Sequence, residues 1–255
     1  MNVRYATSEW AGVASVTLED VQNMRRISAV ISIFLMLILL GGVAMASDRG
    51  DDIMRLQGAA DVLSEVMGAP DGGVPAEVIG DAKCIAIVPS MKKGGLGFGA
   101  SYGKGVASCR TAKGWSAPAF FAVKGGSFGF QIGVQEVDLV MLIMNDNGMR
   151  NLLASKFKLG ADASVAAGPV GRQAEGATDW KMRAQVLTYS RARGIFAGIS
   201  LSGAVITQHQ NDTRAFYGRM VPFRTILTGR IAPPRESEAW LNALRKYAGA
   251  GVDKR

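Results

Sequence analysis

The sequence predicts an α+β fold, in which a coiled antiparallel β-sheet or small barrel of glycine-rich strands is flanked by helices. Short apolar segments rich in β-branched residues follow one another from Lys83 onward, as expected for strands. Eleven glycines between Gly94 and Gly133 are interleaved with aromatic and β-branched residues. Glycine in such a setting is typical of bulges, coiling and close backbone approach rather than of a linker.

The first 46 residues differ from the rest and predict an export signal. Arg25 and Arg26 follow Met24, Ile27–Leu40 is almost wholly apolar, and Ala44–Ala46 offers small residues for cleavage. Residues 24–46 are therefore expected to be a signal peptide, and residues 1–23 an upstream extension foreign to the native protein. The alternative is an uncleaved anchor, because the run extended to Ala46 reaches the minimum length of a membrane span.

Helices are expected at both ends of the exported part. In Asp51–Met67 the apolar residues fall on one stripe at helical spacing, and a glycine-rich stretch then ends the helix. A helical turn is expected at Pro75–Gly80. A last helix, Glu236–Tyr247, carries an apolar face that either lies in a lipid interface or packs on its own domain. The expected organisation is an N-terminal helix and linker (47–73), a strand-rich domain (74–232), and a C-terminal helix and tail (233–255).

Between these helices the pattern predicts mainly strands. Pro89 is expected to end the first strand, Gly103–Gly105 to form a turn, and Asn145–Gly148 to lead into a helix over Met149–Lys158. The apolar run Val137–Met144 suits a buried strand. The expected strands are 84–88, 96–102, 106–111, 119–123, 128–134, 137–144, 161–167, 186–190, 195–201 and 204–209.

Two cysteines, Cys84 and Cys109, both fall in predicted strands. An oxidising compartment permits a disulfide between them. Closing a loop of this length would stabilise the fold by roughly 3 kcal/mol in the chain-entropy model. The sequence alone leaves open a bridge or two buried thiols, because it does not show the distance between the Cα atoms.

Motifs with catalytic potential lack their structural context. Gly125–Gly129 matches Gly-x-Ser-x-Gly around Ser127, with His209 and Asp179 as partners, but a nucleophile elbow needs a helix where a strand is expected. Gly95–Ala100 matches a dinucleotide fingerprint, again without a following helix. One histidine and two cysteines are too few for a usual zinc site. No cofactor and no metal are therefore expected.

The formal net charge of +8 favours acidic partners. Charges in residues 1–46 cancel, so the exported part keeps this excess. Outside the cytosol, nucleic acid is not an expected partner, whereas an anionic membrane is. Lys92 and Lys93 are expected at a strand-to-strand turn, and Lys104, Lys113 and Lys124 in other loops. The alternative is a solvated face with scattered charges that serve solubility.

Several short sequence stretches, taken together and in this order along the chain, resemble the SYLF domain, a lipid-binding domain also called the yeast actin-binding domain. The resemblance covers roughly Ile53–Gly218, and the specificity lies in the ordered set rather than in any single motif. The stretches are Gly114–Pro118, Gly160–Ser164 running into Ala167–Arg172, Tyr189–Gly198 and Ala215–Gly218, with Lys92–Gly95 fitting as well.

The resemblance implies binding to membrane phospholipids, often phosphoinositides, and in fungal relatives to actin filaments, without catalysis. Export would place cytosolic phosphoinositides and actin out of reach. In the family, lipid contact is associated with an N-terminal amphipathic helix. Here that helix carries four acidic residues against Arg55 alone, and anionic head groups repel an acidic face. The acidic residues are Asp51, Asp52, Asp61 and Glu65.

We therefore expect a non-catalytic phospholipid-binding protein of the bacterial cell envelope, periplasmic or secreted, which docks on an anionic membrane surface. The alternatives are an envelope structural or protein-interaction module with a protein partner, and a serine hydrolase using Ser127 and His209. The expected lipid contacts, helped by apolar insertion, are Lys92, Lys93, Lys124, Arg172, Arg191 and Arg193.

Overall fold

A computed structural model of the chain describes residues 49–69, 73–96, 98–128, 133–170, 184–192, 195–198 and 201–249. The chain divides into two units, Met1–Ala46 and Ser47–Arg255, and all described residues belong to the second. The predicted signal peptide lies outside them. Within the described residues, no helix combines the length and the hydropathy needed to cross a membrane.

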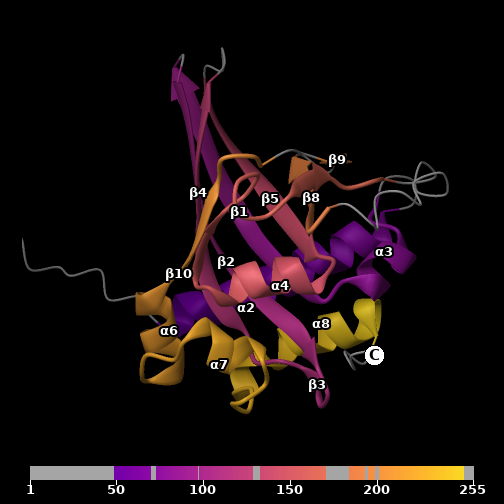
Figure 1. The fold of residues 1–255 in the computed structure, drawn as a ribbon, viewed down its shortest axis with the longest axis vertical. Helices are drawn as coiled ribbons and strands as arrows, with labels where there is room; N and C mark the ends of the chain where they lie inside the picture. Colours follow the sequence, from indigo (N-terminus) through magenta and orange to yellow (C-terminus); the bar gives the residue numbers. More distant parts are fainter. Residues whose placement is uncertain are drawn as a thin grey trace, which may run out of the picture. The chain divides into compact units, whose positions relative to one another are not determined.

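In the described part of the chain, ten strands form one sheet, with β3 pairing β2 and β9 pairing β8 beside the main order β6-β10-β4-β2-β1-β5-β8-β7. All neighbours are antiparallel except β7 and β8. The predicted α+β fold with a coiled, mainly antiparallel sheet is confirmed (Figure 1). The strands are β1 Cys84–Leu96, β2 Phe98–Thr111, β3 Gly114–Trp115, β4 Ala119–Phe128, β5 Gly133–Ile143, β6 Lys156–Lys158, β7 Val165–Ala167, β8 Val186–Ala192, β9 Ile195–Gly198 and β10 Val205–Gln208.

Helices cover both faces of the sheet. One face packs its apolar side chains against α2, α3 and α8, and the other packs against α4 and α7, which lie in front of the sheet in Figure 1. Since alternate side chains of a strand point to opposite faces, each long strand contributes to both cores. The helices are α2 Arg49–Gly68, α3 Ala76–Asp81, α4 Asp146–Leu153, α6 Gln210–Tyr217, α7 Phe223–Leu227, the 3₁₀ turn η2 Arg235–Ser237, and α8 Glu238–Ala248.

The predicted end helices are confirmed, and the apolar face of the last one is occupied. Trp240, Leu241 and Leu244 of α8 are buried in the core shared with α2. The Trp240 indole N–H also donates to the Ser108 hydroxyl at 2.9 Å. This face therefore packs on its own domain, and the alternative of a lipid-facing helix is wrong for it.

The prediction that Pro89 ends the first strand is wrong. β1 continues to Leu96 through an irregularity between Val88 and Met91, where its register with β5 shifts. Ser90 takes a positive φ of 53° there, and its N–H donates to the Asp138 carboxylate at 2.9 Å. A bulge absorbs the proline, which cannot donate to a regular ladder. Lys92 and Lys93 consequently lie within a strand and not at a turn.

The predicted turn at Gly103–Gly105 is also wrong, because β2 runs unbroken from Phe98 to Thr111. A Cβ at Gly103 would come within 2.4 Å of Val88 Cγ1, and one at Gly105 within 2.4 Å of the Ile87 carbonyl oxygen. These glycines are needed for close approach inside the sheet. Lys104 and Lys124 are therefore strand residues, whereas Lys113 lies in a turn as predicted.

The predicted helix over Met149–Lys158 is only partly correct. Asn145 caps α4, accepting a hydrogen bond from the Gly148 N–H, but the helix ends at Leu153 and Lys156–Lys158 forms β6. Helices α6 and α7 were not predicted. The strands expected at 119–123, 137–144, 186–190 and 204–209 are confirmed with shifted ends. Most of the strand expected at 128–134 lies outside the described residues.

The two cysteines form a disulfide. Cys84 and Cys109 are directly opposite each other on β1 and β2, and their Cα atoms are 3.9 Å apart. Both are completely buried. The bridge therefore joins two central strands, β1 and β2, at the end of β1 that directly follows α3.

The need for close backbone approach at Gly105 can be tested by substitution with alanine. Gly105→Ala is expected to lower the free energy of unfolding by about 2 kcal/mol, because the new methyl group overlaps a backbone oxygen and the Phe121 ring. Gly126→Ala is the matched control, since the nearest atom there, the Gly99 oxygen, is 3.9 Å away. It should leave stability unchanged or raise it by about 0.5 kcal/mol. Denaturant unfolding measures both, and equal effects would contradict the close-approach argument.

Removing the disulfide should destabilise the protein. The double variant Cys84→Ala, Cys109→Ala is expected to lose about 3 kcal/mol of unfolding free energy, through the larger entropy of the unfolded chain. Reduction with dithiothreitol should lower the wild-type denaturation midpoint and leave that of the variant unchanged. A wild-type midpoint insensitive to reduction would show that the bridge contributes nothing.

Candidate functional site

A row of side chains crosses five strands of the sheet, and all but the half-buried Val205 are exposed. Lys92 of β1 is opposite Tyr102 of β2, Tyr102 is opposite Lys124 of β4, and Lys124 is opposite Val205 of β10. Val205 is in turn opposite Lys158 of β6. Directly opposed residues share a face, so these five, here called the basic row, lie side by side over roughly 19 Å at about 4.8 Å per strand.

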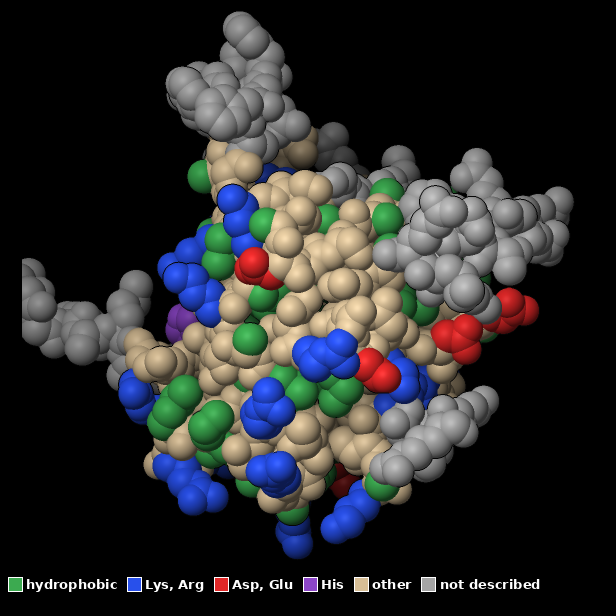
Figure 2. Space-filling model, in the orientation of Figure 1, with side chains coloured by type: hydrophobic (Ala, Val, Ile, Leu, Met, Phe, Trp, Pro, Cys, Tyr) green, Lys and Arg blue, Asp and Glu red, His purple; other side chains and the backbone are tan. Residues whose placement is uncertain are grey.

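The basic row is strongly cationic. Lys92, Lys124 and Lys158 are exposed, as is Lys156, two residues along β6 on the same face. In the described part of the chain, no ion pair joins these four lysines to a carboxylate. Glu136, opposite Lys92, is an acidic neighbour at one end of the row. The basic row lies on the sheet face that packs against α2, whereas Figure 2 shows the opposite face, where Lys and Arg side chains are spread over the left and lower parts of the view.

Apolar groups lie among these charges. Tyr102 is 43% exposed, and Lys124 Nζ lies 5.9 Å from its ring centre. Met54 on α2 is 61% exposed. Tyr102 and Met54 line one shallow, open groove, of about 490 Å³, between the first turns of α2 and the sheet, with Lys92 and Lys104 at its edge. The surface thus combines cations with side chains that can enter a lipid interface.

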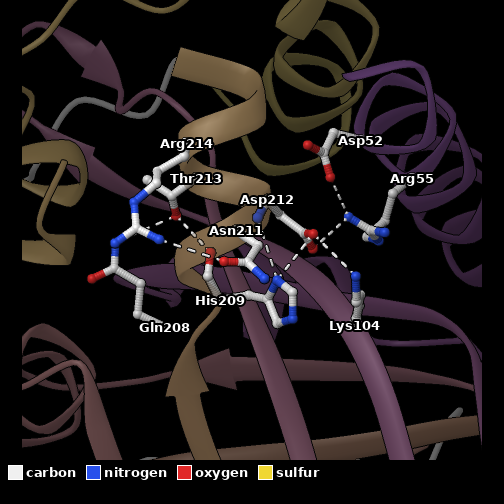
Figure 3. Close-up of polar contacts among 9 residues, drawn as sticks. All are labelled: Asp52, Arg55, Lys104, Gln208, His209, Asn211, Asp212, Thr213 and Arg214. Atoms are coloured by element: carbon white, nitrogen blue, oxygen red, sulfur yellow. Dashed lines mark hydrogen bonds and ion pairs between the residues drawn. The ribbon is translucent and has the colours of Figure 1, made fainter. Parts of the chain in front are cut away.

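An ionic cluster holds α2 against the sheet beside this groove (Figure 3). The Asp212 carboxylate of α6 is completely buried and accepts hydrogen bonds from Arg55 Nη1 and Lys104 Nζ, both at 3.0 Å. His209 Nδ1 lies 2.9 Å from the same carboxylate. Arg55 also donates to Asp52 Oδ1 at 2.7 Å. Two carboxylates are therefore balanced by cations from α2 and β2.

Asp52 is the least satisfied member of this cluster. It is completely buried, and its Oδ2 atom has no hydrogen-bond partner. Burial, together with the nearby negative charge of Asp212, raises the pKa of Asp52 from 3.8 to about 6, although Arg55 opposes the shift. Titration of this carboxyl group is thus moved towards neutral pH.

The six predicted lipid contacts do not form one group. Lys92 and Lys124 come together in the basic row. Lys93 points to the opposite face of the sheet, where it lines a small cavity with Ser101 and Gln135, and burial lowers the pKa of its amino group. Arg172 and Arg193 lie outside the described residues.

Arg191 is on the same face as the basic row, but its charge is neutralised. Its guanidinium pairs with Asp138, with Nη2 at 2.6 Å from Oδ2, and with Glu65 of α2. The sequence analysis missed five members of the candidate surface: Met54, Tyr102, Lys156, Lys158 and Val205. The two lysines were assigned to a helix, and only the pairing of β6 with β10 shows where they point.

The geometry contradicts a catalytic pair of Ser127 and His209. The His209 N–H donates to the Phe120 carbonyl at 2.9 Å, and Ser127 is seven residues further along β4. At about 3.3 Å per residue the two lie roughly 23 Å apart, beyond any hydrogen bond. His209 instead caps α6 and contacts Asp212. Of the Gly95–Ala100 stretch, the described residues pair across β1 and β2, with Gly95 opposite Gly99, and belong to strands instead of a helix.

Comparison with known proteins gives consistent matches. The family model described as "Ysc84: Las17-binding protein actin regulator" matches residues 124–247. SH3 domain-containing YSC84-like protein 1 of Rattus norvegicus is 34% identical over 180 residues, which are 70% of this chain and 53% of the relative. LAS seventeen-binding protein 3 of Saccharomyces cerevisiae is 37% identical over 191 residues, 72% of this chain and 41% of the relative. The chain spans about half the length of the curated relatives it matches, or less.

The raised pKa of Asp52 predicts a pH dependence of stability. Between about pH 4 and pH 6 the folded state binds a proton that the unfolded state has released, so raising the pH through this range lowers the contribution of Asp52 to stability. Asp52→Asn removes this titration. The stability of the variant relative to wild type should therefore improve from pH 4 to pH 7.

Thermal unfolding at several pH values measures this difference. Asp61→Asn, an exposed position on the same helix, is the control and should show no such trend. A constant difference in Tm between wild type and Asp52→Asn from pH 4 to pH 7 would show that Asp52 titrates normally in the folded protein.

Proposed function

The chain belongs to the SYLF domain family, and we propose that it is a non-catalytic protein that docks on the surface of anionic phospholipid membranes. The observation that carries the proposal is the basic row, in which exposed lysines flank Tyr102 without carboxylate partners among the described residues. Its charge complements phospholipid head groups. The apolar groups of Tyr102 and Met54 suit the boundary between head groups and acyl chains.

The number of cations is sufficient for reversible binding. Each lysine near an anionic surface contributes about 1 kcal/mol, so Lys92, Lys124, Lys156 and Lys158 together supply about 4 kcal/mol. Because the groups are solvated, the attraction should fall with salt. Two acidic residues of α2, Asp52 and Glu65, are paired with Arg55 and Arg191, which reduces the repulsion expected from this helix.

We propose that the protein is periplasmic or secreted and acts at the periplasmic face of an envelope membrane. This part of the proposal rests on the signal-peptide pattern of residues 24–46 and on the cationic basic row, which has no carboxylate partner among the described residues. Envelope phospholipids, rather than cytosolic phosphoinositides or actin, are then the accessible anionic partners.

A second candidate is binding to a protein partner. The names of the relatives supply the specific observation, since the Saccharomyces cerevisiae match is called a LAS seventeen-binding protein. Addition of a partner strand at the β6 edge is disfavoured, because this strand has three residues and two of them are exposed lysines. A protein partner of this chain would therefore use another surface.

Co-sedimentation with vesicles tests the lipid proposal. Residues 47–255, once shown to unfold cooperatively, should bind phosphatidylglycerol/phosphatidylethanolamine vesicles at low salt, release them at high salt, and ignore neutral vesicles. The triple variant Lys92→Ala, Lys124→Ala, Lys158→Ala should bind about 100-fold more weakly, since three cations are worth about 3 kcal/mol.

The matched control removes the same charge from three exposed positions outside the row, Arg219→Ala, Arg235→Ala and Lys246→Ala. It should retain most of the binding. If both triple variants lost vesicle binding equally, net charge alone would explain the binding, and a defined docking surface would be contradicted. Absence of wild-type binding to anionic vesicles would overturn the lipid proposal and favour the protein-binding candidate.

A further inference from the structure

A second concave site lies at the opposite end of β2 from the basic row. Its volume is about 470 Å³, within the range of sites that hold one small ligand. Three segments distant in sequence enclose it: the turn and strand Lys113–Trp115, the stretch Gly229–Pro233 after α7, and α8 through Leu241 and Arg245. Tyr102 and Thr111 are nine residues apart on β2, so the two sites are separated by roughly 30 Å.

The charged residues at this site are all cations. Lys113, Arg230 and Arg245 line it and are exposed, and no aspartate or glutamate is among its lining residues. No ion pair to a described carboxylate engages any of the three. Arg245 donates one hydrogen bond, to the neutral amide oxygen of Asn242 at 2.5 Å. Guanidinium groups left with free donors are suited to phosphate or carboxylate oxygens.

Part of the lining of the site is apolar. Trp115, Ala117 and Leu241 are buried side chains that contribute to its wall, and the partly buried Ile231 lies beside them. Polar and apolar groups thus occur together, with the cations exposed and the apolar side chains buried or half-buried. This arrangement fits a ligand with one anionic end and one apolar end.

The walls are held in place before any ligand binds. The Trp115 indole N–H donates to the Gly249 carbonyl at 3.0 Å, and the Arg110 guanidinium stacks on its ring at 4.7 Å. Arg110 in turn donates to the carbonyls of Ala82 and Ala248. Gly229, at a φ of +71°, brings its segment against Thr111, where a Cβ would lie 3.1 Å from Thr111 Cγ2. Preorganised walls lower the entropy cost of binding.

We propose that this site, here called the Trp115 site, binds a single amphipathic anion, namely an alkyl chain with a phosphate or carboxylate head group. Lys113, Arg230 and Arg245 hold the head group, and Ile231, Leu241 and the Trp115 ring contact the chain. The enclosed volume accepts one molecule, unlike the flat basic row, which faces a membrane surface. The inference does not depend on membrane docking, because the two sites share no residue.

Titration of the full chain with octyl phosphate below its micelle concentration tests the proposal. The Trp115 indole N–H resonance in ¹H–¹⁵N spectra reports on the site directly, whatever the apolar N-terminal segment does. Octyl phosphate should shift this resonance saturably. Octyl glucoside, which lacks charge, and inorganic phosphate, which lacks the chain, should each bind at least about tenfold more weakly.

Two double variants sharpen the test. Arg230→Ala with Arg245→Ala should weaken octyl phosphate binding about tenfold or more, through the loss of charge-assisted hydrogen bonds. Arg214→Ala with Arg219→Ala changes the net charge equally at exposed positions outside the site and should bind like wild type. The basic-row variant Lys92→Ala, Lys124→Ala, Lys158→Ala should also bind octyl phosphate normally, which separates this inference from membrane docking.

An unchanged Trp115 resonance at saturating octyl phosphate would overturn the proposal. So would equal affinity for octyl glucoside, which would make the site merely apolar, or for inorganic phosphate, which would make it merely an ion site. Unaltered binding by the Arg230/Arg245 variant, with a resonance that still shifts, would show that these cations do not hold the head group.

Discussion

Burial of the Asp212 carboxylate is the constraint that joins the parts of this fold. A carboxylate removed from water is costly unless cations and hydrogen-bond donors surround it. Here the donors come from α2 through Arg55 and from β2 through Lys104. The position of α2 on the sheet is therefore tied to that of α6. Because α2 is held at this place, it leaves the part of the same sheet face that carries the basic row uncovered by any described helix.

The charges of this protein differ in role according to their neighbours rather than their residue type. Lys104 is used inside the ionic cluster, and Arg191 is paired with Asp138 and Glu65. Lys92 of β1 and Lys124 of β4, on either side of Tyr102 of β2, point into solvent from one row. A positive net charge says only that acidic partners are attracted. The pairing of some cations with buried carboxylates determines which cations remain available for a membrane or a small anion.

The sequence predicted elements well where a local pattern was long and periodic, and poorly where strand pairing overrode local signals. The stripe of α2 and the apolar run inside β5 were read correctly. Pro89 and Gly103–Gly105 were taken as chain breaks, although a bulge absorbs the proline and close packing against Ile87 and Val88 requires the glycines. Lys156–Lys158 comes soon after the capped helix α4, so the local sequence predicted that the helix continues through it. Its pairing with β10 is a long-range contact that the local sequence does not indicate. Of the candidate surface, only Lys92 and Lys124 were identified beforehand.

The sequence by itself determined the class of fold, the helices at its two ends, the family, and the excess of positive charge, because each is written in composition, local period or ordered motifs. The tertiary structure decided which residues meet. It opposed Cys84 to Cys109, placed Lys93 and Lys92 on different faces, and moved Ser127 far from His209. It also assembled the Trp115 site from three distant segments. The physical reason is that the side-chain period of a strand is two, so a bulge or a changed register redirects every following side chain, and register is set by partners far away in the chain.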